Sequence, residues 1–299
     1  MEVKTKLTEA FFDYLHYERG ASEKTLEGYR NSLKAFELFF KSLDSNLDWD
    51  NVDIDVAREW TMSMMENGNK ATSVATRLSA LRSCYKFLFR RGLIDSDPFH
   101  NLTAPKAERP LPAFIRDKDM ERLLDGEDTF SDDGQGLLEK AVIETFYDTG
   151  IRLSELVGLN IDDVNMEQNT IHVTGKGNKQ RIVPFGEKLR ETLNIYIKCT
   201  RARRTAEEKA FFISMKGERM KPKPVRDMVR AKLALVTDQQ KRSPHILRHS
   251  FATTMLNHQA NLEAVKELMG HERLATTEIY THTTFEELRR VYQQAHPRA

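Results

Sequence analysis

The side chains best suited to chemistry in this sequence are cationic, imidazole and phenolic groups at predicted structural junctions. They are Arg152 after a glycine turn, Lys176 at a predicted hairpin tip, His245 and Arg248 at a helix start, His271 after a helix stop, and Tyr280 in a short segment beyond it. His245 and Arg248 are three residues apart, which places them on one face near the positive end of the helix dipole. Taken singly, each residue also fits a plainer role as a surface charge, a cap or a packing group.

Spacing excludes three familiar kinds of site. Residues 175–179 (Gly-Lys-Gly-Asn-Lys) lack the P-loop spacing and its Ser/Thr, and they lie between two predicted strands. His245 and His249 are four residues apart, but no His-Glu-x-x-His zinc pattern is present. The pair 162–163 is a lone acidic pair, whereas a two-metal nuclease needs a second cluster. The sequence therefore predicts neither a metal site nor a cofactor.

Apolar spacing in residues 7–100 predicts four helices. The clearest signal is the recurrence at three- and four-residue intervals of Leu26, Tyr29, Leu33, Phe36 and Phe40. Ser22 is a suitable N-cap for that helix. A second helix follows Asp53 or Asp55, and Gly92 is a suitable stop for the last one.

A proline-rich linker over 101–113 separates this unit from the rest, and we place the boundary near residue 108, giving domains of 1–107 and 108–299. Beyond it, helices are expected over 117–124 and 137–147, and Arg152 precedes a helix that Ser154 would cap. The runs 170–173 and 181–184 predict a β-hairpin. Helical patterns then return, with Ser243 and Pro244 opening one helix, Gly270 ending another and 285–292 forming a last amphipathic one.

Composition favours a globular protein. The 299 residues include 46 Lys and Arg against 45 Asp and Glu, and 39% of the residues are apolar, which excludes collagen-like and low-complexity chains. No uncharged apolar run approaches the ~20 residues of a membrane span, and no signal-peptide core opens the chain. Cys84 and Cys199 make no disulfide framework, which suits a reducing cytoplasm.

The net charge of +1 conceals two basic regions. Residues 67–94 hold six basic residues and no acidic one, and Arg82, Lys86 and Arg90 fall on one helical stripe. A second region comprises Arg201, Arg203, Arg204, Lys216, Arg219, Lys221 and Lys223. Each run could be a solvated helix face. Two runs, one in each domain, favour a clamp on phosphates.

Five strings together resemble the tyrosine recombinases, the phage integrase family. They are Thr-Gly-Ile-Arg-Leu-Ser-Glu-Leu at 149–156, Thr-Gly-Lys-Gly-Asn-Lys-Gln-Arg at 174–181, His-Ile-Leu-Arg-His at 245–249, Leu-Met-Gly-His at 268–271 and Ile-Tyr-Thr-His at 279–282. The N-terminal unit is similar to that family's core-binding domain, through Ser22, Thr25, Tyr29 and the Arg-Leu-Ser-Ala-Leu-Arg string at 77–82. The match is closest to the simple bacterial Xer-type recombinases, which lack an arm-binding domain.

The resemblance implies a mainly α fold, with a SAM-like four-helix core-binding domain and a mixed α/β catalytic domain carrying a small antiparallel sheet. It implies strand exchange through a 3′-phosphotyrosyl intermediate and a Holliday junction, without metal or ATP. The nucleophile would be Tyr280, with His245 as its proton acceptor, Arg152 and Arg248 on the phosphate oxygens, Lys176 as the acid for the 5′-oxygen, and His271 as a further donor. Guanidinium forks suit phosphate better than a lysine does.

The resemblance also implies DNA contacts by Thr72, Ser73, Arg77, Arg82 and Lys86. Partners would be double-stranded DNA with a specific site, a homo- or hetero-tetramer (with a paralogue in the second case), and a septal DNA translocase. The location would be cytoplasmic, at the nucleoid and not in a membrane. The last helix would dock on a neighbouring protomer or pack on its own domain.

Three functions remain as alternatives to chromosome-dimer resolution. Mobile-element integration uses the same chemistry. A type IB topoisomerase cuts and rejoins the same strand, and a non-catalytic DNA-binding protein would not cut at all.

Overall fold

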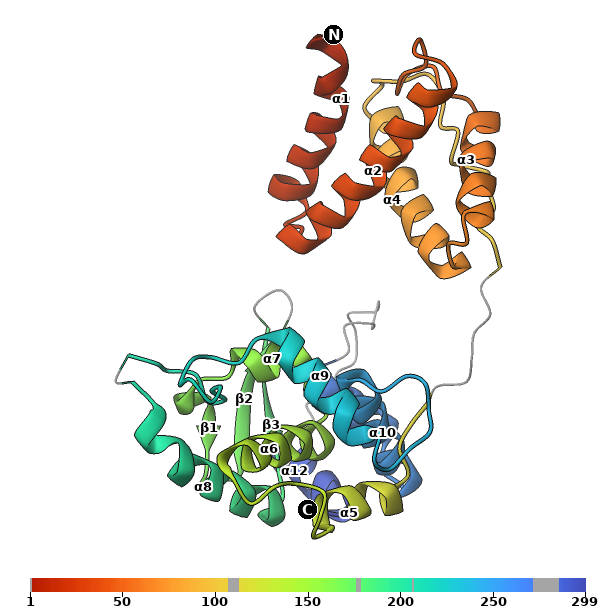
Figure 1. The fold of residues 1–299 in the computed structure, drawn as a ribbon. Helices are drawn as coiled ribbons and strands as arrows, with labels where there is room; N and C mark the ends of the chain where they lie inside the picture. The colour runs from red at the N-terminus through yellow and green to blue at the C-terminus, as the bar shows by residue number, and fades with distance from the viewer. Residues whose placement is uncertain (1, 107–112, 176–178, 206, 271–284) are drawn as a thin grey trace. The chain divides into compact units, whose positions relative to one another are not determined.

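The computed structural model describes residues 2–106, 113–175, 179–205, 207–270 and 285–299. The chain divides into two compact units, Met1–Pro110 and Leu111–Ala299 (Figure 1). The expected boundary near residue 108 falls outside the described residues. Across the described part, no helix is both long enough and apolar enough to cross a membrane.

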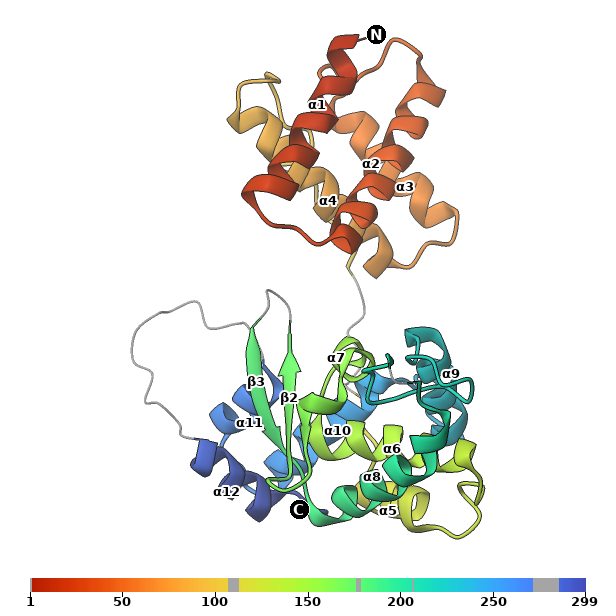
Figure 2. The same ribbon diagram turned by 90° about the vertical axis from the view of Figure 1, so that its left-hand side faces the viewer.

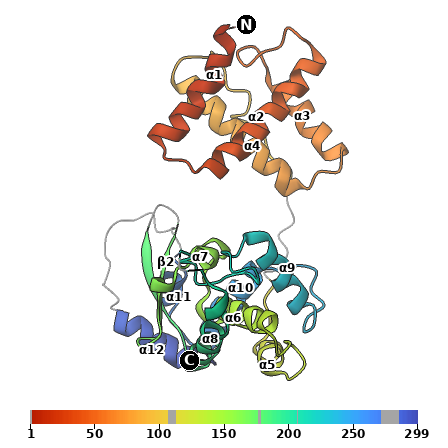
Figure 3. The same cartoon turned by 60° about the vertical axis from the view of Figure 1, so that its left-hand side comes forward.

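The N-terminal unit is built from the four expected helices, displayed together in Figure 3. They are α1 (Glu2–Asp13), extended by a π-helical turn (Tyr14–Glu18), α2 (Glu23–Leu43), α3 (Ile54–Glu66) and α4 (Ala71–Arg90). The predicted caps are confirmed, because the Ser22 hydroxyl accepts from the Thr25 amide and the Asp53 carboxylate accepts at the start of α3. Gly92 follows α4 with φ +66°, a conformation that suits glycine.

The core of this unit is rich in aromatic rings. Phe36 is fully buried and meets the rings of Trp60, Trp49 and Phe99 at centroid distances of 4.9–6.0 Å. The apolar stripe of α2 that sequence spacing revealed is therefore the face that packs inward. Such ring pairs fix the helix packing beyond simple area burial.

The C-terminal unit combines helices with a small antiparallel sheet. Its helices are α5 (Asp117–Asp125), α6 (Gly134–Thr149), α7 (Leu153–Gly158), α8 (Glu187–Thr200), α9 (Pro222–Leu233), α10 (Pro244–Asn257), α11 (Leu262–Met269) and α12 (Phe285–Ala295). The most buried of these is α6, whose residues from Ala141 to Thr149 are all inaccessible to solvent. It contacts α8, α9 and α10, so the domain is assembled around it.

The sheet has the order β1 (Val164–Asn165), β2 (Thr170–Thr174) and β3 (Gln180–Pro184). The predicted hairpin is confirmed, with Val173 opposite Arg181 and Ile171 opposite Val183 in the antiparallel register. Ile171, Val173 and Val183 are buried, so Arg181 occupies a position on the core-facing side. Figure 2 shows β2 and β3 side by side, and α11 and α12 both contact β3.

Helix α12 packs on its own domain in this single chain. Its Leu288 and Tyr292 are buried with Phe251 and Met255 of α10 and with residues of α11. This is one of the two arrangements that the sequence left open. Beyond the helix, Arg298 is also buried, where it pairs with acidic side chains.

One predicted cap is wrong. The N-cap position of α7 is Arg152, and Ser154 lies exposed within the helix. The Glu155 carboxylate accepts a hydrogen bond of 2.8 Å from the Arg152 backbone amide, so the cap comes from inside the helix. Ser243 does hold the N-cap position of α10, followed by Pro244.

Candidate active site

Three arginines converge on the last carbonyl groups of α11. Arg181 donates to the carbonyl of Leu268, Arg248 to that of Met269, and Arg152 to that of Gly270. These guanidinium groups come from β3, from α10 and from the turn before α7. Carbonyls at a helix C-terminus lack partners within the helix and carry partial negative charge, so cations are stabilised there. The end of α11 therefore gathers positive charge from three distant parts of the chain.

Arg152 is held at both terminal nitrogens. Its Nη1 donates to Glu155 Oε1 at 2.8 Å and its Nη2 to the Gly270 carbonyl at 2.7 Å. The side chain is half-buried. A guanidinium has five N–H donors, so a group with two in use can still bind an anion through the others. The anchored fork is thus oriented before any ligand arrives.

Arg248 is more deeply placed, with only 6% of its surface exposed. Its Nη1 donates to the Gly150 carbonyl at 2.6 Å, which joins α10 to the turn that carries Arg152. Burial and the charge of Arg152 lower the pKa of Arg248 to about 10. Arg248 stays charged at neutral pH, and a bound anion would stabilise that buried charge. The structure therefore brings together the two arginines that the sequence singled out.

Glu155 and Arg181 belong to the same cluster, although sequence reasoning gave them no role. Glu155 is buried and receives two hydrogen bonds of 2.9 Å from Arg181, one on each carboxylate oxygen. Although burial raises it, hydrogen bonds and charge from Arg181 and Arg152 lower the pKa of Glu155 to about 2. One signal was present in the sequence, since Arg181 alternates with Val183 on the apolar side of a strand.

Three of the other predicted catalytic residues, Lys176, His271 and Tyr280, lie outside the described residues, but the residues before two of them are described. Lys176 follows Gly175, whose missing Cβ would lie 3.5 Å from Glu155 Oε1 and 3.9 Å from Arg152 Nη1. His271 follows Gly270, whose carbonyl binds Arg152. Tyr280 lies within 271–284 and also stands outside the described part.

His245 lies exposed in the first turn of α10, three residues before Arg248. Partial desolvation, followed by the charges of Arg248, His249 and Arg152, lowers its pKa below the ordinary 6.5. The imidazole is therefore neutral at physiological pH and able to accept a proton.

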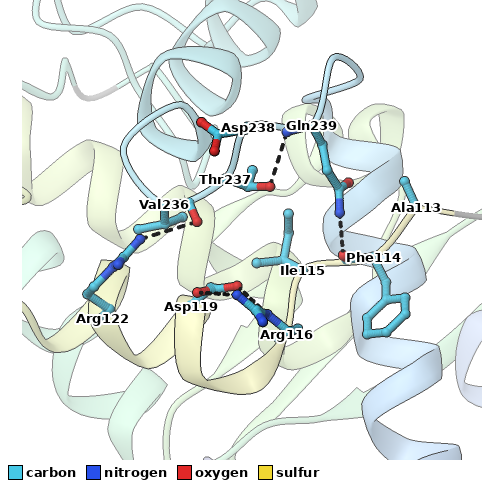
Figure 4. A pocket seen from close by; sticks show the side chains of 10 residues that line it. All are labelled: Ala113, Phe114, Ile115, Arg116, Asp119, Arg122, Val236, Thr237, Asp238 and Gln239. Carbon is cyan, nitrogen blue, oxygen red and sulfur yellow. Dashed lines mark hydrogen bonds and ion pairs between the residues drawn. The ribbon is translucent and has the colours of Figure 1, made fainter.

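No group of three metal-ligating side chains occurs among the residues that the structure describes. A hollow lies away from this cluster, where the chain enters the C-terminal unit (Figure 4). Its lining includes Arg116 paired with Asp119, and Gln239 bonded to the Phe114 carbonyl. Of the predicted catalytic residues that the structure describes (Arg152, His245 and Arg248), none lines this hollow.

The predicted DNA-binding residues of α4 behave differently from one another. Thr72, Ser73 and Lys86 are exposed. Arg77 is half-buried, with its Nη1 3.7 Å from the Met64 sulfur. Arg82 donates to the carbonyls of Phe99 and Leu102, so it fastens the segment after α4. A role in binding DNA stays a prediction for all five.

Arginines of the second basic region also turn inward. Arg204 donates to the Phe211 carbonyl at 3.0 Å, and Arg219 donates to the Val157 carbonyl at 2.9 Å. Lys216, Lys221 and Lys223 are exposed. Among the described side chains of this region, the fully exposed positive charges are therefore those of the lysines.

Gly270→Ala is expected to lower the free energy of unfolding by about 1–2 kcal/mol for its backbone alone, since φ is +63°. A Cβ would also lie 3.0 Å from Arg181 Nη1, adding about 1 kcal/mol or more of crowding. Urea denaturation measures the loss. The matched control is Gly92→Ala, where φ is +66° and no atom lies within 4 Å of the added Cβ. Equal losses in the two variants would contradict the crowding argument.

Two family models match the chain. The phage integrase family model covers residues 113–287, and the model of the phage integrase N-terminal SAM-like domain covers 8–92. Tyrosine recombinase XerC of Pseudomonas savastanoi pv. phaseolicola is 38% identical over 97% of this chain and 96% of its own. XerC of Mycobacterium sp. strain KMS is 39% identical over 97% of this chain and 98% of its own. The fold is shared by a crystal structure of the XerH site-specific recombinase bound to palindromic difH substrate in a post-cleavage complex. The TM-score is 0.70 and the sequence identity is 22%, over 91% of this chain and 80% of that one.

Near-full-length similarity to these enzymes accompanies the clustered arginines in the C-terminal unit. The chain belongs to the phage integrase family, as a tyrosine-type site-specific DNA recombinase.

Proposed function

We propose that this recombinase cuts and rejoins DNA strands through a covalent bond between Tyr280 and a 3′-phosphate. The observation that carries the proposal is the paired placement of Arg152 and Arg248 on adjacent carbonyls at the end of α11. Two anchored guanidinium groups form a site for one phosphate, and their donors match its non-bridging oxygens. They stabilise the extra negative charge of the pentavalent transition state.

The remaining roles are those that the resemblance to the family implies, and with them the protons balance. The Tyr280 oxygen attacks phosphorus, and its proton passes to neutral His245, because a phenol with a pKa of about 10 needs an acceptor. The bond from phosphorus to the 5′-oxygen breaks, and Lys176 supplies the proton for that oxygen. His271 adds a hydrogen bond to the phosphate. The bond energy stays in the phosphotyrosine, so a 5′-hydroxyl of another strand can reverse the reaction.

A nicked suicide DNA tests this chemistry directly. Such a substrate loses its 5′-end fragment after cleavage, so the covalent complex accumulates. We expect mass spectrometry of the digested complex to find the nucleotide on Tyr280. Attachment to any other residue, or the absence of a complex on DNA that the protein binds specifically, would contradict the proposal.

The rate of covalent complex formation is expected to fall in acid, with a midpoint below pH 6.5, because a base must be unprotonated to accept a proton. The lowered pKa of His245 extends full activity to a lower pH than an ordinary histidine would allow. Single-turnover rates from pH 5 to 8 measure the midpoint. His245→Gln provides the control, and a variant that kept the same profile would remove His245 from this role.

In the cell, we propose that two pairs of strand exchanges, passing through a Holliday junction, resolve chromosome dimers. Support comes from relatives named XerC that match along nearly the whole chain. We further propose a tetramer on a specific duplex site, formed by this chain alone or together with a paralogue, with a septal translocase as activator, at the nucleoid in the cytoplasm. Exposed Thr72, Ser73 and Lys86 on α4 are available to contact the duplex.

Sequencing the genomic fragments that the protein retains tests the cellular role. Chromosome-dimer resolution requires one fixed chromosomal site. Retention of the two ends of a mobile element would instead favour integration. Relaxation of supercoiled DNA by a monomer, without recombinant products, would favour a topoisomerase.

A further inference from the structure

Arg181 makes three hydrogen bonds that join separate parts of the catalytic domain. Its Nε donates to the Leu268 carbonyl at 2.8 Å, and its two terminal nitrogens each donate to one oxygen of Glu155 at 2.9 Å. The side chain starts on β3, in the strand that leads away from the hairpin tip. One planar group thus links β3 to both α7 and α11.

Glu155 connects Arg181 to Arg152 through hydrogen bonds to both. Its Oε1 is shared, at 2.8 Å from Arg152 Nη1 and 2.9 Å from Arg181 Nη1. Without Arg181, the buried Glu155 carboxylate would keep only its hydrogen bonds to Arg152. The carboxylate could then rotate, and the Arg152 guanidinium that it holds could move with it. The side chain of Glu155 is 1% exposed, so water cannot easily replace the lost donors.

Arg181 also fits against Gly270. The missing Cβ of Gly270 would lie 3.0–3.2 Å from atoms of the Arg181 guanidinium and its stem. The Gly270 carbonyl is the second anchor of Arg152. Arg181 therefore contacts the supports of Arg152 on both sides, through Glu155 and at the end of α11, without being hydrogen-bonded to Arg152 itself.

We infer that Arg181 is a positioning residue that fixes the Arg152 guanidinium for the scissile phosphate by way of Glu155 and the end of α11. The inference rests on the proposed role of Arg152 at the phosphate. It predicts that losing Arg181 harms the part of the reaction that depends on Arg152. Misplacing a catalytic group by about 1 Å can lower a rate by about 100-fold.

A substrate pair separates this role from a merely structural one. One suicide DNA carries the ordinary scissile phosphate, and the other carries a methylphosphonate, in which a methyl group replaces a charged non-bridging oxygen. The neutral linkage has less need of a guanidinium. We expect Arg181→Gln to slow cleavage of the phosphate by about 100-fold and of the methylphosphonate by less than about tenfold. Arg152→Gln should give the same pattern, and the double variant should be no slower than Arg152→Gln alone.

Arg190→Gln is the matched control, since it removes one arginine from an exposed ion pair with Glu187. It should cleave both substrates at the native rate. Arg181→Lys provides a second variant if Arg181→Gln unfolds, because the ammonium keeps the charge but cannot reach both oxygens and the carbonyl as a planar fork does. It should show a smaller loss with the same preference for the neutral substrate.

Equal losses on the two substrates, or losses that add to those of Arg152→Gln, would overturn the inference. Failure of the native protein to form a covalent complex on either DNA would instead contradict the proposed function. The two failures are therefore distinguishable in one experiment.

Discussion

Arg248→Lys is expected to slow strand cleavage by about a thousandfold while leaving single-site DNA binding and the free energy of unfolding close to native. The native guanidinium reaches the carbonyls of Gly150 and Met269 with separate nitrogens. These two bonds hold the guanidinium in one orientation, in which we propose that it meets the phosphate. An ammonium is a single point of charge, so it can take one of these carbonyls but cannot present a fixed fork.

The free energy of unfolding should change little, because the positive charge at this position destabilises the folded protein when no anion is bound. Burial and the neighbouring Arg152 lower the pKa of Arg248, which means that its positive charge is disfavoured before an anion binds. A lysine retains an apolar stem and can shift its ammonium away from Arg152. Under the proposed mechanism, this arginine serves the negative charge that develops during the reaction more than it serves the stability of the free protein.

Single-turnover cleavage of a suicide substrate, half-site binding and urea denaturation measure the three quantities. Arg122→Lys is the control, because Arg122 also donates to a carbonyl, that of Val236, in the hollow away from the cluster. It should react at the native rate. A loss below about tenfold for Arg248→Lys, or a matching loss of binding, would show that the fork is not needed in the transition state.

Local patterns in the sequence predicted the elements well. The apolar spacing of α2, its Ser22 cap and the glycine stop at Gly270 each depend on residues within a few positions of one another. The hairpin was equally visible, because alternation and turn residues are local features. The short strand β1 was missed, since two residues carry no periodicity.

Long-range polar partners could not be predicted from such patterns. Arg152 and Gly270 are 118 residues apart in sequence, and their hydrogen bond exists only because α11 packs beside the turn before α7. Arg82 shows the same limit. Its place in a basic stripe predicts a phosphate ligand, but that pattern does not reveal the hydrogen bonds that its guanidinium donates to the Phe99 and Leu102 carbonyls. Helical periodicity gives the face of a side chain but not its hydrogen-bond partner.

Residue type and order predicted that two of the site arginines lie together, but they did not predict the residues that hold them in place. Arg152 and Arg248 were expected together and are together. Glu155 and Arg181 stand in the same strings, but a buried ion pair between α7 and β3 has no local signature. The acidic partners of Arg298 lie still farther away, since Glu144 precedes it by 154 residues.

Arg298→Ala is expected to lower the free energy of unfolding by about 3–5 kcal/mol near neutral pH. Only 4% of Arg298 is exposed, and it pairs with Glu144 and with Asp125 at 2.9 Å, while its Nε lies 3.8 Å from Asp148. Glu144 and Asp148 are fully buried on α6. Removing the cation leaves these two carboxyl groups without its charge in the centre of the domain.

The loss should grow as the pH rises. Burial and the charge of Glu144 raise the pKa of Asp148 well above its ordinary value, against the opposing charge of Arg298. A carboxyl group with a raised pKa in the folded state binds more protons there than in the unfolded chain, so stability falls as pH increases above about 4. Without Arg298 this pKa rises further and the decline continues to higher pH.

Urea denaturation of the native protein and the variant at pH 5 and pH 8 measures the difference. It should be larger at pH 8, and adding Glu144→Gln to Arg298→Ala should recover part of the loss, because one buried charge is then absent. Arg290→Ala, an exposed change on α12, is the control and should cost little at either pH. A deficit that stayed below about 1 kcal/mol, or that did not change with pH, would mean that the buried acids do not depend on Arg298. If the loss has the expected size, Arg298 stabilises α6 from a position beyond α12. Helix α6 ends just before the turn that carries Arg152.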